Sequence, residues 1–398
     1  MTIGKAKDTF IVGAARTAVG RFLGGLASLR APDLGAAAIK AAVERSGVDP
    51  QAVDGVIMGN VCPAGIGQNP ARQASIIAKL PVTVPALTVN KVCGSGMVAI
   101  GLGCQQIKAG DAKVMVAGGQ ESMSNVPYYL KTLRNGNKMG DTKLVDGLIY
   151  DGIWDYFGDV HMGILGDFTA QHAGVTREEQ DRWSARSHAN AVAAIKAGKF
   201  KAEIVPISIP QRKGDPIVID TDEGPRADTT FEKLAGLKPV FGKDGTVTAG
   251  NASSINDGGA ALVLADGAYV KEHGLKPLAR VVAYATGSVE PKMLFFAPIT
   301  AVKNLMKVHG VNIDHYDLIE INEAFASQVL ADGKGLGWNP DKVNVTGGAI
   351  SLGHPIGCSG ARVVVSLIHS LRERGLKTGL AAACLGGGEA TAISVELV

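Results

Sequence analysis

Short runs of apolar and β-branched residues alternate along the chain with longer segments of helical periodicity, a pattern that is typical of α/β proteins. In the first third of the chain, apolar runs predict strands at residues 9–14, 53–58 and 114–117. Apolar positions with helical spacing predict a helix over 33–46, and Gly47 follows it as a typical stop residue. The pattern therefore predicts an α/β fold.

The same order of elements returns near the C-terminus, with predicted strands at 278–285, 318–321, 342–346 and 379–384 and predicted helices at 298–309 and 358–374. Residues 54–58 also resemble 317–321, and the segments 114–121 and 381–389 both end in glycines and a glutamate. Two copies of one βαβ-rich unit explain these similarities, and chance likeness between ordinary α/β segments is the alternative. A duplicated unit can build two similar sheets with a site between them.

Residues 125–250 break this repetition with loop-rich stretches such as 211–216. A helix is predicted from Thr176 towards Gly198, because Thr176 and Glu179 have the spacing of a capping box. We interpret the region as an insertion that carries substrate-binding loops. The predicted domains are residues 1–124 with 251–276 for the first half, 125–250 for the insertion, and 277–398 for the second half.

Composition and charge narrow the possible functions. Hydrophobic residues make up 46% of the chain and charged residues 19%, which suits a globular protein and not a disordered one. The net charge of +3 comes without a basic block, so nucleic acid is not an expected partner. No apolar run is long enough for a membrane span, and residues 1–10 have neither a signal-peptide core nor an arginine-rich targeting stretch. We therefore expect a cytoplasmic protein without a membrane partner.

The cysteines are widely spaced and form no Cys-x-x-Cys pair: they are Cys62, Cys93, Cys104, Cys358 and Cys384. Their odd number and their spacing argue against a disulfide framework and against a zinc site, and no metal is expected. Some of these thiols are expected to fill the core, as free cysteines usually do, and others to take part in chemistry.

Cys93 lies in a glycine-rich turn between a predicted strand and a helical run that extends to Lys108. A thiol at a helix N-terminus is close to the positive end of the helix dipole and to free backbone N–H groups. Both favour the thiolate, which is the reactive form. The alternative is a small buried cysteine at a tight turn.

Three further candidates lie in the second half. His354 is surrounded by glycines ahead of a predicted helix, although a lone loop histidine is commonly a surface residue. Cys384 ends a predicted strand and leads into three glycines, which indicate the close approach of a ligand or of a second backbone. The pair Asn322 and Glu323 follows a predicted strand, where α/β folds often place functional groups. A helix N-cap by Asn322 is the alternative.

Four motifs occur in the order and spacing of one protein family: Cys93-Gly-Ser-Gly-Met, Asn322-Glu-Ala-Phe, Gly353-His-Pro-Ile-Gly with Ser359-Gly-Ala-Arg, and Cys384-Leu-Gly-Gly-Gly. Stretches at 12–20, 67–72, 119–124, 161–163, 250–253 and 256–258 follow the same pattern. Through them the chain resembles the thiolase family over essentially its whole length. The resemblance implies two similar α/β halves, layered α-β-α-β-α, with an inserted loop domain.

The resemblance also implies a reaction, the Claisen condensation of two acetyl-CoA to acetoacetyl-CoA plus CoA, and its reversal by thiolysis. Cys93 would be the acylated nucleophile, His354 its base, and Cys384 the second acid/base. One oxyanion hole would combine His354 with a water held by Asn322. The other would use the backbone N–H groups of Cys93 and Gly386.

Positions that contact coenzyme A in the family correspond here to His161, Met162, Arg226, Leu237, Phe241, Ala249 and Ser253. Many bacterial members have a serine where this chain has Lys233, so that position is left out. The resemblance implies no metal or redox cofactor, because coenzyme A thioesters are substrates. It also implies a homotetramer built as a dimer of dimers.

Three alternatives remain on the sequence: a thiolase for longer acyl chains, a β-ketoacyl synthase-like condensing enzyme, and a catalytically silent acyl carrier. Family position places Leu294 at the wall of the acyl pocket, with Phe295 or Phe296 beside it. Such bulky side chains predict a preference for short acyl groups. The alternative is that both rings pack into the core and leave the pocket unchanged.

Overall fold

A computed structural model describes residues 8–398 of the chain. The expectation about a targeting segment concerns residues 1–10, and most of these lie outside the described residues. Within 8–398, no helix combines the length and the apolar character that a membrane crossing requires.

The first half of the chain builds five neighbouring strands of a mixed sheet, in the order β1 (Thr9–Thr17), β13 (Asn256–Asp266), β5 (Val114–Ser122), β3 (Gly55–Gly59) and β4 (Ala86–Val89). β3 pairs in parallel with β4 and with β5, whereas β13 is antiparallel to both β5 and β1. The long β13 is buried along its whole length, so it forms the centre of this half.

The second half repeats this arrangement in the order β14 (Ala279–Ser288), β17 (Glu389–Leu397), β16 (Thr378–Leu385) and β15 (Leu318–Ile321). β15 and β16 are parallel, as β3 and β5 are in the first half. β17 is antiparallel to both β16 and β14, as β13 is to β5 and β1. The two halves join through a short antiparallel pairing of β1 with β14, at Thr9 and Val281. The matching order and direction of the strands support the predicted duplication.

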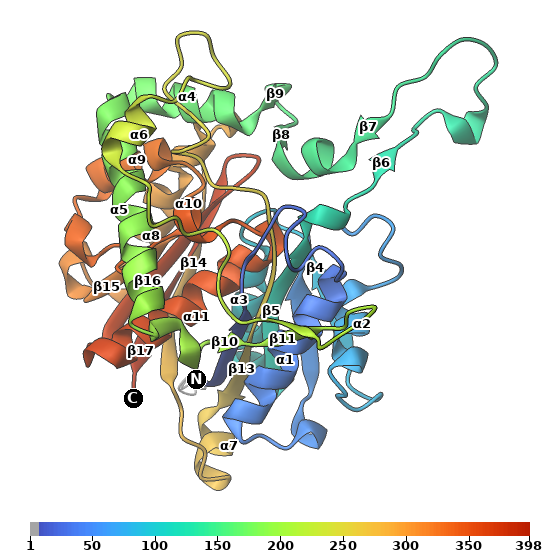
Figure 1. The fold of residues 1–398 in the computed structure, drawn as a ribbon. Coiled ribbons are helices and arrows are strands. Elements are labelled where there is room, and N and C mark those ends of the chain that lie inside the picture. The colour runs from blue at the N-terminus through green and yellow to red at the C-terminus, as the bar shows by residue number, and fades with distance from the viewer. Residues whose placement is uncertain (1–7) are drawn as a thin grey trace.

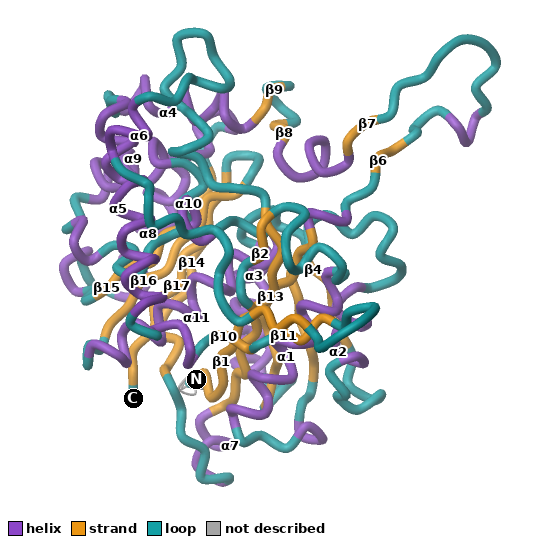
Figure 2. The backbone as a smooth tube through the Cα atoms, viewed as in Figure 1, coloured by secondary structure: helices purple, strands orange, loops and turns teal. Residues whose placement is uncertain are grey.

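Helices cover both faces of the sheet halves and fill the space between them (Figures 1 and 2). α3 (Ser95–Ala109) and α11 (Ile356–Arg374) pack against each other in the middle layer, and their apolar residues share one core with both halves of the sheet. α1 (Ala31–Ser46) and α2 (Pro70–Ile77) cover the outer face of the first half. α8 (Ala297–His309) and α9 (Ala326–Leu336) pack on the second half. This arrangement is the predicted α-β-α-β-α layering.

Most predicted elements are confirmed with shifts of a few residues, but the strand predicted at 342–346 is wrong. A short 3-10 helix occupies Pro340–Lys342, and Val343 makes only an isolated parallel bridge to Ile319. Asn344 then adopts a left-handed backbone with φ of 48°, and its side-chain amide bonds both the N–H and the C=O of Ile321 at 2.9 Å. A side chain thus replaces the backbone ladder of a strand.

The region between the halves carries α4 (Met162–Ala173), α5 (Arg177–Lys196) and α6 (Phe231–Ala235). The predicted capping box is confirmed, because Glu179 N–H donates to Thr176 Oγ1 and Thr176 N–H donates to Glu179 Oε2. An arm with β6 (Tyr128–Tyr129) and β7 (Val145–Asp146) projects away from the body (Figure 1). The predicted division of the chain at the stated domain boundaries stays a prediction.

The remaining short elements are β2 (Gly20–Arg21), β8 (Trp154–Asp155), β9 (Val160–His161), β10 (Ile204–Val205), β11 (Ile207–Ile209), β12 (Ile217–Ile219), α7 (Gly267–Glu272) and α10 (Ala349–Leu352). β10 pairs with the end of β1 and β2 pairs with β13, so both extend the central sheet. A π-helical turn spans Leu148–Ile153, and a 3-10 helix spans Pro291–Phe296.

Candidate active site

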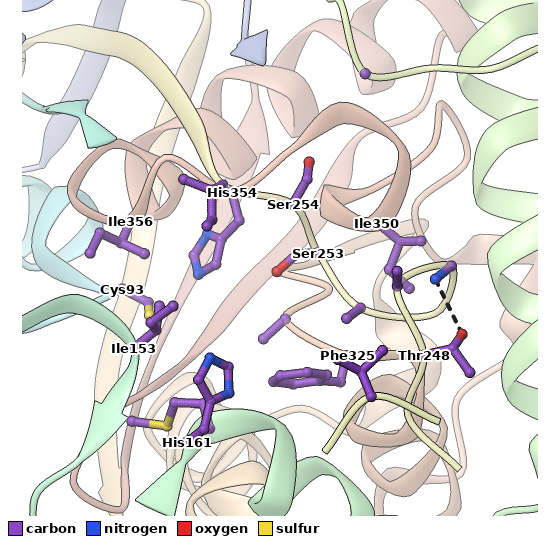
Figure 3. A pocket seen from close by; sticks show the side chains of 18 of the residues that line it. Cys93, Ile153, His161, Thr248, Ser253, Ser254, Phe325, Ile350, His354 and Ile356 are labelled. Carbon is purple, nitrogen blue, oxygen red and sulfur yellow. Dashed lines mark hydrogen bonds between the residues drawn. The ribbon is translucent and has the colours of Figure 1, made fainter. Parts of the chain in front are cut away.

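A cavity of about 690 Å³ opens where the two halves and the inserted region meet. It brings together four of the predicted catalytic residues, Cys93, His354, Cys384 and Gly386. All seven predicted coenzyme A contacts also line it: His161, Met162, Arg226, Leu237, Phe241, Ala249 and Ser253. In Figure 3, Cys93, His354 and His161 come from different elements and point into one space. The structure supports the grouping of these residues, whereas their roles stay predictions.

Cys93 lies in a tight turn between β4 and α3. Ser95 closes this turn, since its hydroxyl accepts the Lys91 N–H at 2.8 Å and donates to the Val92 carbonyl at 2.6 Å. Val92 has a φ of 46°, an unfavourable value for a β-branched residue, so the turn holds local strain. Gly94 is required because a Cβ there would lie 2.2 Å from Leu385 Cδ2. The turn thus presents the Cys93 thiol to the cavity.

Two opposing effects act on the protonation state of Cys93. Burial raises the pKa of its thiol to about 12, although the backbone N–H groups of Cys93 and Gly386 lower it. The favourable effect of the helix N-terminus is therefore outweighed by desolvation, and the resting residue is a thiol. The predicted influence of the backbone N–H groups is thus present, but it is smaller than the effect of burial.

The backbone around His354 fixes its ring in the cavity wall. Gly353 has a φ of 111°, which favours glycine, and the His354 N–H donates to Asn256 Oδ1 at 2.9 Å. His354 Nδ1 lies 2.6 Å from Ser359 Oγ, and the Ser359 hydroxyl donates to the Pro355 carbonyl at 2.9 Å. Since that hydroxyl has a single proton, Nδ1 must be the donor in the first contact. Nε2 is therefore left with a lone pair.

Burial and, to a smaller extent, the positive charge of Arg362 together lower the pKa of His354 to about 3. The imidazole is therefore neutral at physiological pH. The neutral ring can accept a proton through its Nε2 lone pair, although the lowered pKa makes it a weaker base than an ordinary histidine. A protonated ring could not.

Asn322 lies directly behind His354, with Nδ2 at 3.4 Å from Nε2. Its Oδ1 is buried and has no hydrogen-bond partner among residues 8–398. A buried orphan acceptor commonly marks a place for water or ligand, which fits the predicted oxyanion role. The alternative role as a helix N-cap is wrong, because α9 begins at Ala326 with Phe325 before it.

Glu323, the neighbour of Asn322, has a structural role. Its carboxylate accepts hydrogen bonds from Trp183 Nε1, Ser187 Oγ, Asn344 Nδ2 and the Ile350 N–H, at 2.8 to 3.1 Å. Trp183 and Ser187 lie on α5, Ile350 lies in α10, and Asn344 lies in the loop before α10. The two residues of the predicted polar pair therefore point to different environments.

Cys384 ends β16 deep in the cavity wall. It packs in an apolar cluster with Leu294, Phe295 and Phe325. Burial raises the pKa of its thiol well above the ordinary value, and the nearby Cys93 raises it further. The two thiols are thus close enough to influence each other.

The glycines after Cys384 lie in two different environments. Gly386 lines the cavity. Gly388 has a φ of 89°, and a Cβ there would meet the Val289 carbonyl at 2.7 Å. The close approach of a second backbone is therefore confirmed at Gly388, whereas the approach of a ligand at Gly386 stays a prediction.

The outer part of the cavity is largely apolar. His161 stacks on Phe241 with ring centroids 4.5 Å apart, and its Nδ1 accepts the Gly163 N–H at the start of α4. The wall is completed by Leu234, Leu237, Val240 and Ala249. Such a channel fits a long, uncharged ligand arm.

Within residues 8–398, no three His, Cys, Asp or Glu side chains converge as a metal-binding group.

Two residues that form hydrogen bonds with His354 had no predicted role. Ser359 and Asn256 orient His354 through its ring and its backbone. Both lie inside the motifs that carried the resemblance, but residue type alone gives no sign of this function. Asn256 is 98 residues away from His354 in sequence, so only the folded chain shows the contact.

Comparison with known proteins agrees with this geometry. Residues 9–268 match the N-terminal domain of thiolases and residues 275–397 match the C-terminal domain. The chain is 54% identical over 389 residues to acetyl-CoA acetyltransferases of Pseudomonas aeruginosa and of Cupriavidus necator, with 98% of this chain and 99% of each relative covered. The crystal structure of the Bacillus anthracis acetyl-CoA acetyltransferase covers 99% of this chain, as this chain does of it, with a TM-score of 0.97 and 43% identity. The chain therefore belongs to the thiolase family.

Proposed function

We propose that the protein is an acetyl-CoA acetyltransferase, which condenses two acetyl-CoA to acetoacetyl-CoA and CoA and catalyses the reverse thiolysis. The observation that carries this proposal is the meeting of two thiols and a neutral imidazole, Cys93, Cys384 and His354, in one cavity. The acetyl-CoA acetyltransferases that share about half of its sequence support the choice of substrate.

In the first half-reaction Cys93 becomes acetylated. His354 Nε2 takes the thiol proton while the Cys93 sulfur attacks the thioester carbon. A new C–S bond forms as the C–S bond to CoA breaks, and Cys384 gives its proton to the departing CoA thiolate. The enzyme is left with acetyl-Cys93, an imidazolium and a Cys384 thiolate.

In the second half-reaction the Cys384 thiolate removes a proton from the methyl group of a second acetyl-CoA. Burial raises the pKa of this thiol well above normal, so its thiolate is a strong base for a weak carbon acid. The enolate carbon attacks the acetyl-Cys93 carbonyl and expels the Cys93 thiolate. The His354 imidazolium returns its proton to Cys93, which restores the starting enzyme.

Negative charge develops on the thioester oxygens in both half-reactions. The N–H groups of Cys93 and Gly386 already favour the Cys93 thiolate, and they are the proposed donors to one oxyanion. His354 and a water on Asn322 Oδ1 would serve the other. The apolar outer channel, with His161, Met162, Leu237, Phe241, Ala249 and Ser253, would hold the uncharged pantetheine arm.

Brief incubation with acetyl-CoA followed by peptide mass mapping tests the proposal. We expect one acetyl group on Cys93, with release of one CoA. Acetylation that is confined to Cys384, or no acetylation, would refute it. A β-ketoacyl synthase-like enzyme would instead consume malonyl thioesters, so a parallel assay with malonyl-CoA separates the two functions.

We also propose a homotetramer built as a dimer of dimers. Two separate surfaces support it, because a dimer of dimers needs two kinds of contact. The projecting arm exposes large apolar side chains, namely Tyr128, Leu133, Met139 and Leu144. A second patch surrounds the edge strand β4, with Ile76, Ile77, Val82 and Leu87. Light scattering should give four chains for the parent and two for Met139→Glu.

A cytoplasmic location is a further part of the proposal. The mechanism requires Cys93 and Cys384 as free thiols, and a reducing compartment keeps thiols reduced. Cell fractionation with detection of the protein would test it.

A further inference from the structure

We infer that Arg21 pairs with Arg226 across the cavity mouth to bind the phosphate groups of the coenzyme A thioester. This inference rests on the proposed function and adds a binding residue to it. Arg226 follows from the family resemblance, whereas Arg21 was given no role by its sequence. Arg21 lines the same cavity as Cys93, and it is contributed by β2 of the first half.

Arg21 and Arg226 lie on two segments that are joined by an ion pair and hydrogen bonds. Arg16, in β1, forms a bidentate contact with Asp222, at 2.7 and 2.9 Å, and this ion pair is completely buried. One residue further on, Glu223 accepts the Arg21 backbone N–H at 2.8 Å. The backbone that carries Arg21 is therefore held against the segment that leads to Arg226.

Both guanidinium groups are available for a ligand. Arg21 and Arg226 are exposed, and neither side chain forms an ion pair or a hydrogen bond within residues 8–398. The nearest carboxylates are occupied, because Glu223 accepts the backbone N–H groups of Arg21 and Gly25, and Asp228 pairs with Lys233 at 2.8 Å. Glu223 and Asp228 thus lie near the two arginines, but neither carboxylate forms an ion pair with either guanidinium group within residues 8–398.

His188 lies near both arginines at the cavity mouth. Its Nδ1 accepts the Arg226 backbone N–H at 3.1 Å, and it lines the cavity with both of them. Burial, the charge of Arg226 and the charge of Arg21 together lower the pKa of His188 to about 4, and the charge of Asp228 opposes them. The field of both arginines therefore reaches the same point of the rim.

The chemistry of this rim fits phosphate. A guanidinium group offers parallel N–H donors that match two phosphate oxygens, and two such groups suit a diphosphate or two neighbouring phosphates. The walls between the rim and Cys93 are largely apolar, so a thioester at Cys93 would have its uncharged arm in the channel and its anionic end at the arginines.

The test compares acetyl-CoA with acetyl-pantetheine, which carries the same thioester and arm but no phosphate. For Arg21→Ala we expect KM of Cys93 acetylation to rise about tenfold with acetyl-CoA and to stay unchanged with acetyl-pantetheine, while kcat is maintained. The dependence of the acetyl-CoA KM on salt should also weaken. Acetyl-dephospho-CoA lacks the 3′-phosphate but keeps the diphosphate. If Arg21→Ala raises its KM as well, Arg21 binds the diphosphate, and if it does not, Arg21 binds the 3′-phosphate.

Arg30→Ala is the matched control, because Arg30 is an exposed arginine paired with Asp33 away from the cavity. An equal rise of KM for both thioesters in Arg21→Ala, or no rise for either, would overturn the inference. If the parent enzyme is not acetylated by acetyl-CoA at all, the proposed function fails instead. The inference is then decided by calorimetric binding of CoA and pantetheine to the parent and to Arg21→Ala.

Discussion

Ser359 Oγ lies 2.6 Å from His354 Nδ1 and donates its own proton to the Pro355 carbonyl, so a single hydroxyl sets the tautomer of the histidine. The neutral ring keeps its lone pair on Nε2, on the side of Asn322. The position of the lone pair that the proposed mechanism needs thus depends on the Ser359 hydroxyl.

Ser359→Ala should lower kcat of Cys93 acetylation by about tenfold to a hundredfold, because the ring loses the contact that fixes its tautomer and angle. KM should change little. Steady-state kinetics with a thermal melt as folding control would measure this. A kcat equal to that of the parent would show that the hydroxyl is dispensable.

The alkylation of Cys93 should reveal its raised pKa. Since the pKa is about 12, the thiolate fraction is small at neutral pH and grows about tenfold with each pH unit. The iodoacetamide rate should therefore climb from pH 6.5 to 9.5 without levelling, with Cys93→Ala as the control for other thiols. A plateau near pH 8 would indicate a normal or lowered pKa.

Cys384→Ala should separate the two half-reactions. The variant should still be acetylated at Cys93, but more slowly, because the departing CoA thiolate loses its proton donor. Exchange of the acetyl-CoA methyl protons with deuterated water should fall much further, by about a hundredfold or more. NMR follows the exchange, and mass spectrometry follows the acetylation. Condensation at the parent rate would rule out the acid/base role of Cys384.

The structure separates the two phenylalanines that the sequence left equivalent. Phe295 lines the cavity beside Leu294 and contacts Phe325 edge-on at 5.1 Å, whereas Phe296 packs against His172 outside it. Acetoacetyl-CoA should therefore be the best substrate for thiolysis, since each added methylene that clashes costs about 1–3 kcal/mol.

Phe295→Ala should raise kcat/KM for the six-carbon substrate relative to acetoacetyl-CoA, and Phe296→Ala should leave that ratio unchanged. A panel of β-ketoacyl-CoA lengths with all three proteins measures it. Parent activity on eight- or ten-carbon substrates that equals the activity on acetoacetyl-CoA would make the enzyme a broad-range thiolase.

Glu323→Ala should destabilise the fold by about 3 kcal/mol or more, because its removal leaves several buried donors without an acceptor. Glu323→Gln keeps one acceptor oxygen and should lose less. Denaturant unfolding gives the free energies. A loss below about 1 kcal/mol for the alanine variant would mean that the network adds little.

The sequence by itself determined the parts that depend on near neighbours. The strands β1, β15 and β16, the helices α1 and α11, and the capping box at Thr176 follow from apolar spacing and from contacts a few residues apart. The turn at Cys93 also follows from local residues, and the motifs in their order identified the family. These features need no knowledge of distant segments.

Only the tertiary structure decided the properties that depend on burial and on distant partners. Residues 342–346 look like a strand, but the Asn344 side chain bonds Ile321 instead. The helix N-terminus favours a Cys93 thiolate, but desolvation by the assembled halves raises its pKa to about 12. A pKa and a hydrogen-bond partner are set by all atoms within a few ångströms, and folding brings these atoms from any position in the chain.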